Sequence, residues 1–114
     1  MYVVFPVPAE FRDLVYGRHW MRNGIPCLKE VLGLEGDRVC IFTDRLEINE
    51  RLTGPVFSVD SSGNPLPQHR GCFIVPTGYF FAASRHFAKR FDGRYFGPLP
   101  LKVVTGEARP LWTF

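Results

Sequence analysis

The stretch FDGRYFGPLP, Phe91–Pro100, places three aromatic rings beside an acid and an arginine and then ends in two prolines. A surface segment would avoid so many rings, because burial of aromatic side chains is a large favourable term. Two glycines and two prolines within eight residues argue against a helix through the stretch. We therefore predict a turn that leads into a strand, with the rings in the core and the charges of Asp92 and Arg94 held by neighbouring groups.

The composition indicates one folded domain that spans residues 1–114. Eleven Phe in a chain that is 46% hydrophobic can fill a core, which excludes a largely disordered chain. Ten Pro and eleven Gly interrupt the chain often and favour strands and loops over long helices. A net charge of +3 is too weak to indicate nucleic-acid binding, and no apolar run approaches the roughly 20 residues of a membrane span. We expect a mainly β domain.

Residue patterns along the chain predict short strands and one short helix. Phe11, Leu14 and Val15 share one helical face, which predicts a helix over 9–20. Alternating or β-branched runs bounded by turn residues predict the strands. These strands are expected at 2–5, 25–34, 38–44, in a hairpin over 45–53, in two pieces of 71–84, and in the last segment, 101–114; the intervening 59–67 and 84–94 are expected to be loops.

The cysteines and histidines show no metal-binding pattern. Cys27, Cys40 and Cys72 contain no CxxC pair, and the three histidines have no acidic or cysteine partner at ligand spacing. We expect no metal and no cofactor. Three buried thiols are the first expectation for the cysteines, and one disulfide with one free thiol, outside the cytosol, is the alternative.

Lys29 is the strongest candidate for chemistry. We expect a strand at 25–34 with Leu28, Val31 and Leu32 as inward residues, although their spacing alone could also be helical. A strand places Lys29 opposite to Leu28. A lysine held against apolar surface loses the solvation of its ammonium group, so its pKa falls and it can act as a general base. The alternative is an exposed strand lysine.

Two other charged motifs have a structural interpretation. Asp92 and Arg94 can lie on one side of an extended segment, where we expect a structural ion pair or a clamp on a neighbouring strand. The segment SRHFAKRF, 84–91, mixes cationic side chains with rings, a composition that can bind single-stranded nucleic acid. Asp92 interrupts the basic–Gly–aromatic pattern of RNA-binding domains, and their strand–helix order is missing, so we expect no nucleic-acid partner.

Taken in order, PCLKEVLGLEGDRVCIF, GNPLP, GCFIVPTGYFFAAS, RFDGRYFGPLP and VVTGEARPLWT resemble the signal peptidase I superfamily. They resemble most closely its conjugative-transfer branch, the TraF-like serine peptidases. The specific motifs are Lys-x-Val-x-Gly-x-x-Gly-Asp-x-Val and Asp-Gly-Arg-Tyr-Phe-Gly-Pro, and Gly-x-Ala-x-Pro-Leu-Trp supports the branch. The resemblance runs from Tyr2 to Thr113 and implies a signal-peptidase-like antiparallel β domain with one short helix.

The resemblance implies a serine endopeptidase with a Ser–Lys dyad, in which a serine attacks the scissile carbonyl and a neutral lysine takes its proton. Lys29 would be this general base. Gly36 and Asp37 would form the turn that follows it, and Asp92 and Arg94 would hold a late loop against the lysine strand.

Two positions near the implied dyad depart from the family pattern. The residue two before Asp92 is often serine in the family and is Arg90 here. The residue after the lysine is commonly basic and is Glu30 here. An arginine near Lys29 would favour its neutral form, and Glu30 would oppose this. We hypothesise that Glu30 and Arg90 form a swapped ion pair that supports the site.

The nucleophile of the family lies in a Ser-Met/Leu-Pro motif upstream of the stretch that matches YVVF, 2–5, and these residues do not contain it. We expect the membrane helix and the nucleophile-bearing segment to be absent from this chain, and the chain alone to be inactive. The whole protein would process an exported pilin-type precursor at the periplasmic face of the bacterial inner membrane, in a conjugative pilus or type IV secretion system. Its partners would be the precursor, other transfer-apparatus proteins and the cytoplasmic membrane. The alternative is a non-catalytic, peptidase-like interaction component of the same machinery.

Overall fold

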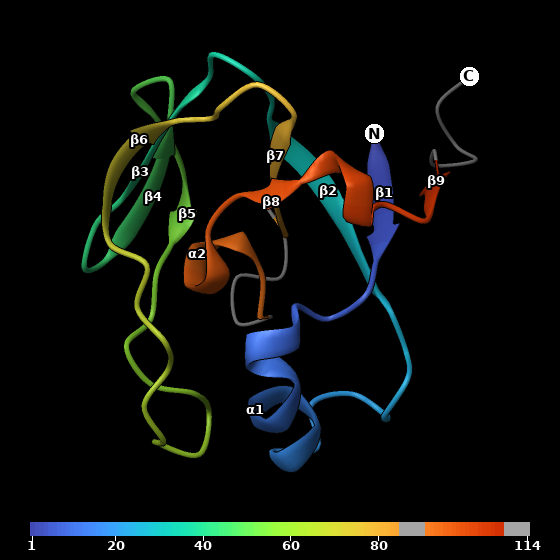
Figure 1. Cartoon of the computed structure of the whole chain (residues 1–114). Coiled ribbons are helices and arrows are strands. Elements are labelled where there is room, and N and C mark those ends of the chain that lie inside the picture. The colour runs from blue at the N-terminus through green and yellow to red at the C-terminus, as the bar shows by residue number, and fades with distance from the viewer. Residues whose placement is uncertain (85–90, 109–114) are drawn as a thin grey trace.

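The structure, a computed structural model, describes residues 1–84 and 91–108, and within them nine strands form two antiparallel sheets (Figure 1). The first sheet has the order β8-β7-β2-β1-β9, and the second has the order β5-β4-β3-β6. The first contains β1 Tyr2–Phe5, β2 Cys27–Gly33, β7 Tyr79–Ala83, β8 Leu99–Pro100 and β9 Gly106–Ala108. The second contains β3 Arg38–Ile41, β4 Arg45–Ile48, β5 Arg51–Pro55 and β6 Gly71–Ile74.

The helices are short: η1 Ala9–Phe11, α1 Arg12–Gly17, α2 Gly93–Phe96 and η2 Leu101–Val103. None of the helices in the described ranges is long and apolar enough to cross a bilayer. The structure confirms the mainly antiparallel β class and the expected order of strands. The helix predicted over 9–20 ends earlier, at Gly17, because His19 adopts a φ of 58°, which a right-handed helix cannot continue.

The stretch 91–100 differs from its prediction, because a helical turn precedes the short strand β8. Asp92 is the N-cap of α2, and its side chain accepts a hydrogen bond from the backbone N–H of Arg94 at 3.0 Å. Gly97 follows the helix with a φ of 79°, a conformation that favours glycine and ends the turn. The glycines and prolines that argued against a helix lie at its ends, where they are tolerated.

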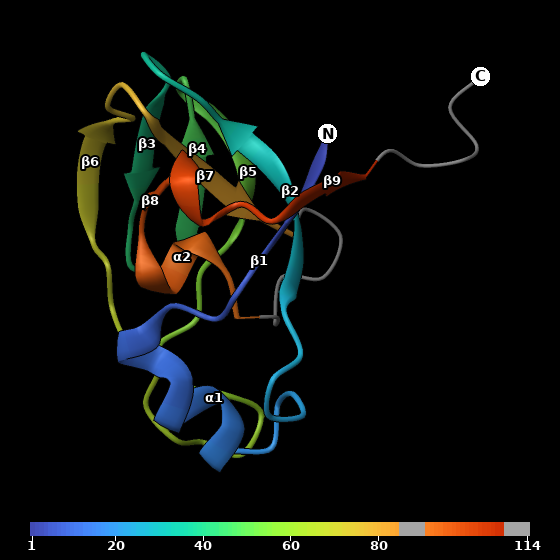
Figure 2. The ribbon, with the colours of Figure 1, turned by 45° about the vertical axis from the view of Figure 1, so that its right-hand side comes forward.

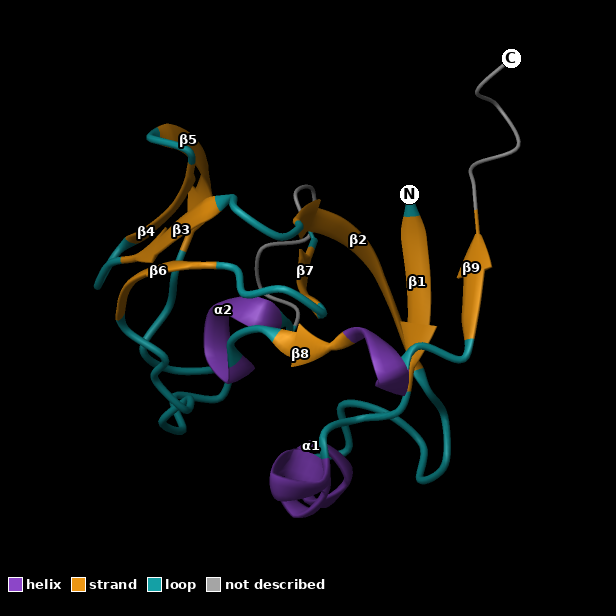
Figure 3. Ribbon diagram, turned by 45° about the horizontal axis from the view of Figure 1, so that its top comes forward, coloured by secondary structure: helices purple, strands orange, loops and turns teal. Residues whose placement is uncertain are grey.

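Strand β7 separates two hydrophobic clusters and contributes to both. Its alternating side chains place Phe80 and Ala82 in the first cluster, and Phe81 and Ala83 in the second. The α2 turn does the same, with Phe96 in the first cluster and Tyr95 in the second. Figure 3 shows α2 between the two sheets. Tyr95 and Phe96 are therefore core residues, as predicted, and the third ring, Phe91, is partly buried against both clusters.

The buried face of β2 is not the face predicted, because Leu28 points to solvent. Leu28 is 56% exposed, and Cys27 and Lys29 are buried on the other face. Val31 and Leu32 are partly buried and pack against the first and second clusters, respectively. A register shift between Val31 and Gly33 lets consecutive residues face the core. The inward assignment of Leu28 was wrong because Leu28, Val31 and Leu32 have the i, i+3, i+4 spacing of a helical face, whereas side chains of a strand alternate between its two faces.

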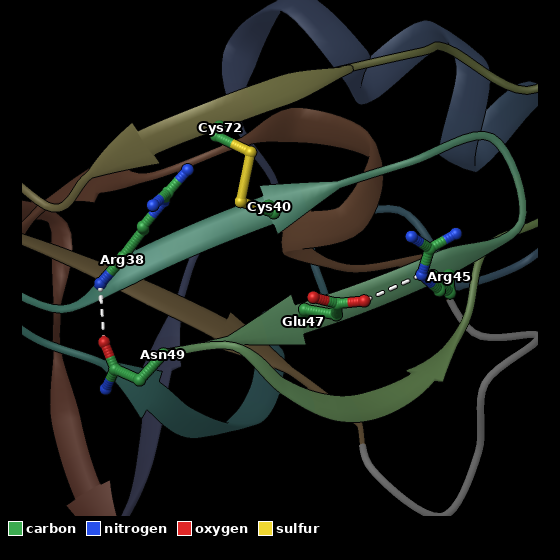
Figure 4. Close-up of a disulfide and its surroundings, with 6 residues drawn as sticks. All are labelled: Arg38, Cys40, Arg45, Glu47, Asn49 and Cys72. Atoms are coloured by element: carbon green, nitrogen blue, oxygen red, sulfur yellow. Dashed lines mark hydrogen bonds and ion pairs between the residues drawn. A yellow bond between two sulfur atoms is a disulfide. The ribbon is translucent and has the colours of Figure 1, made fainter.

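The first expectation for the cysteines, three buried thiols, is also wrong. Cys40 and Cys72 lie opposite each other in the register of β3 and β6 and form a disulfide (Figure 4). Cys27 remains a buried free thiol. The pairing depends on two strands whose cysteines are 32 residues apart in sequence, so the spacing of the cysteines did not reveal it.

Candidate active site

Lys29 lies on the buried face of β2. It pairs with Val3 of β1 in the antiparallel register, and the alternation of the strand puts it on the same side as Cys27. Lys29 is only 9% exposed, which excludes the alternative of an exposed strand lysine. Burial of an ammonium group is costly unless the surroundings compensate for it, so this position is a candidate functional site.

A cavity of about 930 Å³ opens beside Lys29. Residues from the end of α1 form one wall, the segment 57–66 forms another, and β2 contributes Lys29. Most of the lining is apolar with a few polar groups, as is usual for ligand sites. The cavity is lined by Val15, Trp20, Met21, Pro26, Cys27, Leu28, Lys29, Phe57, Val59, Asp60, Ser61, Leu66, Phe91 and Tyr95.

Asp92 and Arg94 form the predicted ion pair, and both are fully buried. Arg94 Nη1 donates to Asp92 Oδ2 at 2.6 Å. Both residues also bind the backbone of Ser84, just after β7: the Ser84 N–H donates to Asp92 at 2.9 Å, and Arg94 Nη2 donates to the Ser84 carbonyl at 3.0 Å. Since β7 pairs with β2, the ion pair fastens α2 beside the strand that carries Lys29.

The charges of this region interact with one another. Burial raises the pKa of Asp92, while Arg94, the N–H groups of Ser84 and Arg94, and Lys29 act to lower it. Burial also raises the pKa of Cys27, which the charge of Lys29 lowers and that of Asp92 raises. The charge of Lys29 therefore acts on both Asp92 and Cys27, and the charge of Asp92 also acts on Cys27.

Gly36 and Asp37 form the predicted turn, which leads from β2 in one sheet to β3 in the other. Gly36 has a φ of 89°. The carboxylate of Asp37 accepts hydrogen bonds from the Leu34 N–H at 2.8 Å and from Asn49 Nδ2 at 3.1 Å, and these hydrogen bonds lower the pKa of Asp37. Neither Gly36 nor Asp37 lines the cavity, and the turn lies at the end of β2, the strand that carries Lys29.

Arg90 lies outside the described residues, so the proposed Glu30–Arg90 pair stays a hypothesis. Glu30 itself is partly buried in β2, opposite Tyr2 of β1 and Ala83 of β7.

Sequence reasoning missed several residues of the site. Tyr95 lines the cavity, and its hydroxyl oxygen accepts a hydrogen bond from the Phe57 N–H at 3.2 Å. Arg18 and Asp60 form an ion pair between the two walls at 3.1 Å. The composition of the loop at 59–67 indicated a turn, but its partner lies 42 residues away, and no local pattern reveals such a contact.

Comparisons with known proteins show which sequences and folds this chain is similar to. The family described as "Signal peptidase, peptidase S26" matches residues 2–112. The chain is 36% identical over 119 residues to the conjugal transfer protein TraF of Agrobacterium fabrum, covering 97% of this chain and 66% of that protein. It is 31% identical over 90 residues to the plasmid transfer protein TraF of Escherichia coli, covering 76% and 51%. The chain thus spans about half to two thirds of these relatives.

The fold is also similar to that of a solved bacterial protein. A crystal structure of a signal peptidase I from Enterococcus faecalis matches with a TM-score of 0.52 and 23% identity, covering 95% of this chain and 92% of that one. At this identity the likeness concerns the fold alone.

Proposed function

Because the chain belongs to the signal peptidase (peptidase S26) family, we propose that it is the lysine-bearing part of a Ser–Lys endopeptidase of a conjugative transfer system. One observation carries the proposal: Lys29 is 9% exposed and lines an apolar cavity of about 930 Å³. In this role Lys29 is the general base, and the cavity receives an apolar side chain of an extended peptide.

The buried ion pair supports a neutral Lys29. A lone carboxylate at Asp92 would favour the charged ammonium form of a nearby lysine. Arg94, bonded to the same carboxylate at 2.6 Å, offsets this effect. Asp92 and Arg94 are thus positioning residues in the proposal, and Gly36 and Asp37 hold the end of β2.

In the proposed mechanism a serine hydroxyl transfers its proton to Lys29 Nζ as its oxygen attacks the scissile carbonyl, and backbone N–H groups stabilise the resulting oxyanion. We propose that this serine belongs to a Ser-Met/Leu-Pro motif that these residues do not contain. Ser61 lines the cavity but stands in no nucleophile motif, so it serves as a control position.

The proposed substrate is an exported pilin-type precursor, processed at the periplasmic face of the inner membrane with other transfer-apparatus proteins as partners. Two observations support this setting. Two similar proteins are transfer proteins by name. The Cys40–Cys72 disulfide fits an oxidising compartment outside the cytosol.

The first test is an NMR titration of the lysine side chains. The chain has three lysines, so their signals are few, and Lys102, which is exposed, is the internal control. We expect Lys29 to titrate well below the usual value of about 10.4. An ordinary pKa for Lys29, both in this chain and in a chain extended upstream through the serine motif, would contradict the general-base role.

The second test is cleavage of a precursor by the extended chain. Lys29→Arg should lower the cleavage rate by about 10²- to 10⁴-fold, the usual contribution of a general base. Lys102→Arg and Ser61→Ala should leave the rate unchanged. Loss of cleavage in Ser61→Ala alone would indicate that the nucleophile is Ser61, in the 57–66 segment.

A non-catalytic, peptidase-like interaction component is the second candidate, and Glu30 favours it. An acid directly after Lys29, where the family commonly has a basic residue, opposes a neutral lysine. Normal assembly of the transfer apparatus with Lys29→Arg, together with uncleaved precursor in the unmodified cell, would support this candidate over the peptidase.

A further inference from the structure

The two walls of the cavity are joined by an ion pair that the proposed chemistry does not use. Arg18 follows α1, and Asp60 lies in the segment 57–66. Arg18 Nη1 donates to Asp60 Oδ2 at 3.1 Å across 42 residues of sequence. Trp20 and Met21 line the cavity on the Arg18 side, and Asp60 and Ser61 line it on the other. Figure 2 shows α1 at the lower end of the molecule, next to the loop that follows β5.

Hydrogen bonds within its own segment also hold the carboxylate of Asp60 in place. Its Oδ1 accepts hydrogen bonds from the N–H groups of Ser62 and Asn64, both at 2.9 Å. Its other oxygen is thereby directed at the guanidinium group. The Asp60 side chain is 9% exposed and that of Arg18 is 26% exposed, so solvent screens this pair less than a fully exposed one.

Arg18 also contacts the cavity wall on its own side, through Trp20. Its guanidinium carbon lies 5.4 Å from the centre of the Trp20 ring, within the range of a cation–π contact. The position of Trp20 in the cavity wall is therefore coupled to that of Arg18, and through Arg18 to that of Asp60.

We propose that Arg18 and Asp60 are a positioning latch that holds the 57–66 segment against the residues after α1 and so controls access to the cavity beside Lys29. Separation of the pair lets the segment move away and admits an extended peptide with an apolar side chain. The latch rests on the cavity of the proposed peptidase site, but access can be measured without any peptidase activity.

Cys27 reports on access. It lines the same cavity, it is 4% exposed, and it is the free cysteine of a chain whose other two cysteines form a disulfide. In the absence of reductant, an alkylating reagent such as iodoacetamide can therefore label only Cys27. Its labelling rate under native conditions measures how often the cavity opens.

The test compares Cys27 labelling in the unmodified chain, Arg18→Gln, Asp60→Asn and the double variant. Asparagine keeps one oxygen for the N–H groups of Ser62 and Asn64, and it replaces the charged oxygen that accepts from Arg18 with an NH2 group. Each single variant should be labelled about two- to fivefold faster, as expected for loss of a partly screened ion pair. The double variant should be no faster than the faster single variant, because both remove the same contact.

Two controls separate the latch from general destabilisation. Arg18→Lys keeps the positive charge and should be labelled at nearly the rate of the unmodified chain. Arg45→Gln, which removes the ion pair with Glu47 in β4, should not change the rate. Low urea concentrations should also leave the rates unchanged, because a local opening exposes little surface.

Unchanged rates in Arg18→Gln and Asp60→Asn would overturn the latch, as would rates that multiply in the double variant or rise steeply with urea. If the peptidase proposal fails and the latch proposal holds, Lys29 should have an ordinary pKa while the labelling rate of Cys27 still depends on Arg18 and Asp60.

Discussion

The buried pair of Asp92 and Arg94 shows how single residues support the site. Both side chains have no exposed surface, and each also binds the backbone of Ser84. A Cβ at Gly54 would lie 2.8 Å from Arg94 Nη2, so the guanidinium group packs directly against the backbone of β5. Arg94 thus contacts both sheets, since Ser84 follows β7 and Gly54 lies in β5.

Replacement of Asp92 by Asn should be strongly destabilising. The change leaves the guanidinium group of Arg94 buried without its counter-charge, which costs about 3–5 kcal/mol. Urea unfolding measures this cost. As a control, Glu47→Gln breaks the exposed pair with Arg45 and should cost less than about 1 kcal/mol. Equal costs for the two variants would mean that the carboxyl group of Asp92 is already neutral in the native protein.

The hydrogen bonds that lower the pKa of Asp37 predict that the stability of the fold depends on pH. Asp37→Ala loses two hydrogen bonds and should lower the free energy of unfolding at pH 7 by about 1–2 kcal/mol. Because the pKa of Asp37 is lower in the folded state, its contribution is complete above the unfolded value of about 3.9 and is lost as the pH falls through the folded value.

Chemical denaturation of the unmodified chain and Asp37→Ala between pH 7 and pH 2.5 checks this dependence. The two stabilities should converge below about pH 3.9. Asp13→Ala, at an exposed position of α1, is the control and should stay within about 0.5 kcal/mol of the unmodified chain at pH 7. A constant difference for Asp37→Ala across this range would contradict the assignment.

At the scale of secondary-structure elements, α2 fits its place because Gly93 has no side chain. A Cβ at this position would lie 2.6 Å from the carbonyl oxygen of Ala82 and 2.8 Å from Phe81 Cε2. The first of these is backbone in the middle of β7, which cannot move without disturbing the sheet. The close approach places Tyr95 and Phe96 in the two clusters.

Gly93→Ala should therefore lower the free energy of unfolding by about 1–3 kcal/mol or more, the range for overpacked cores. Gly17→Ala is the matched control, because a Cβ there meets nothing within 4 Å and Gly17 is the last residue of α1. Gly17→Ala should be neutral or stabilising by up to about 1 kcal/mol. Equal effects of the two variants in thermal unfolding would exclude the close packing of α2 on β7.

At the scale of the whole molecule, the disulfide ties the edge strand β6 to β3 across a loop of the chain. This loop contains β4, β5 and the 57–66 segment, so the crosslink restricts a large part of the unfolded chain. Figure 4 shows the disulfide bridging β3 and β6. Cys27 lies in the other sheet and takes no part in it.

Reduction of the disulfide should destabilise the fold by about 2–4 kcal/mol, with the cost arising mainly in the unfolded ensemble. Thermal unfolding with and without reductant measures this cost, and a Cys40→Ala, Cys72→Ala double variant should not respond to reductant. Mass spectrometry of the denatured, unreduced chain should count one free thiol. Three free thiols after expression in an oxidising compartment would contradict the pairing.

Several features follow from local pattern alone. Alternation and β-branched residues predict the strands at 2–5 and 38–44 and the hairpin over 45–53, and the structure has β1, the shorter β3 and the β4–β5 hairpin there. The motif around Lys29 identifies the family, and the pair Asp92–Arg94 is read correctly as an ion pair. These features depend on neighbours within a few residues, so the sequence is enough to predict them.

Other features depend on contacts between distant segments. The face of β2 that is buried, the partner of Cys40, the length of α1 and the contact of Arg18 with Asp60 each depend on what packs against them. Burial of Lys29 is the clearest case, because its neighbours in sequence fit an exposed strand as well as a buried one. Its 9% exposure arises where β1, β7 and the cavity walls come together, and desolvation of a charge is a property of that whole environment.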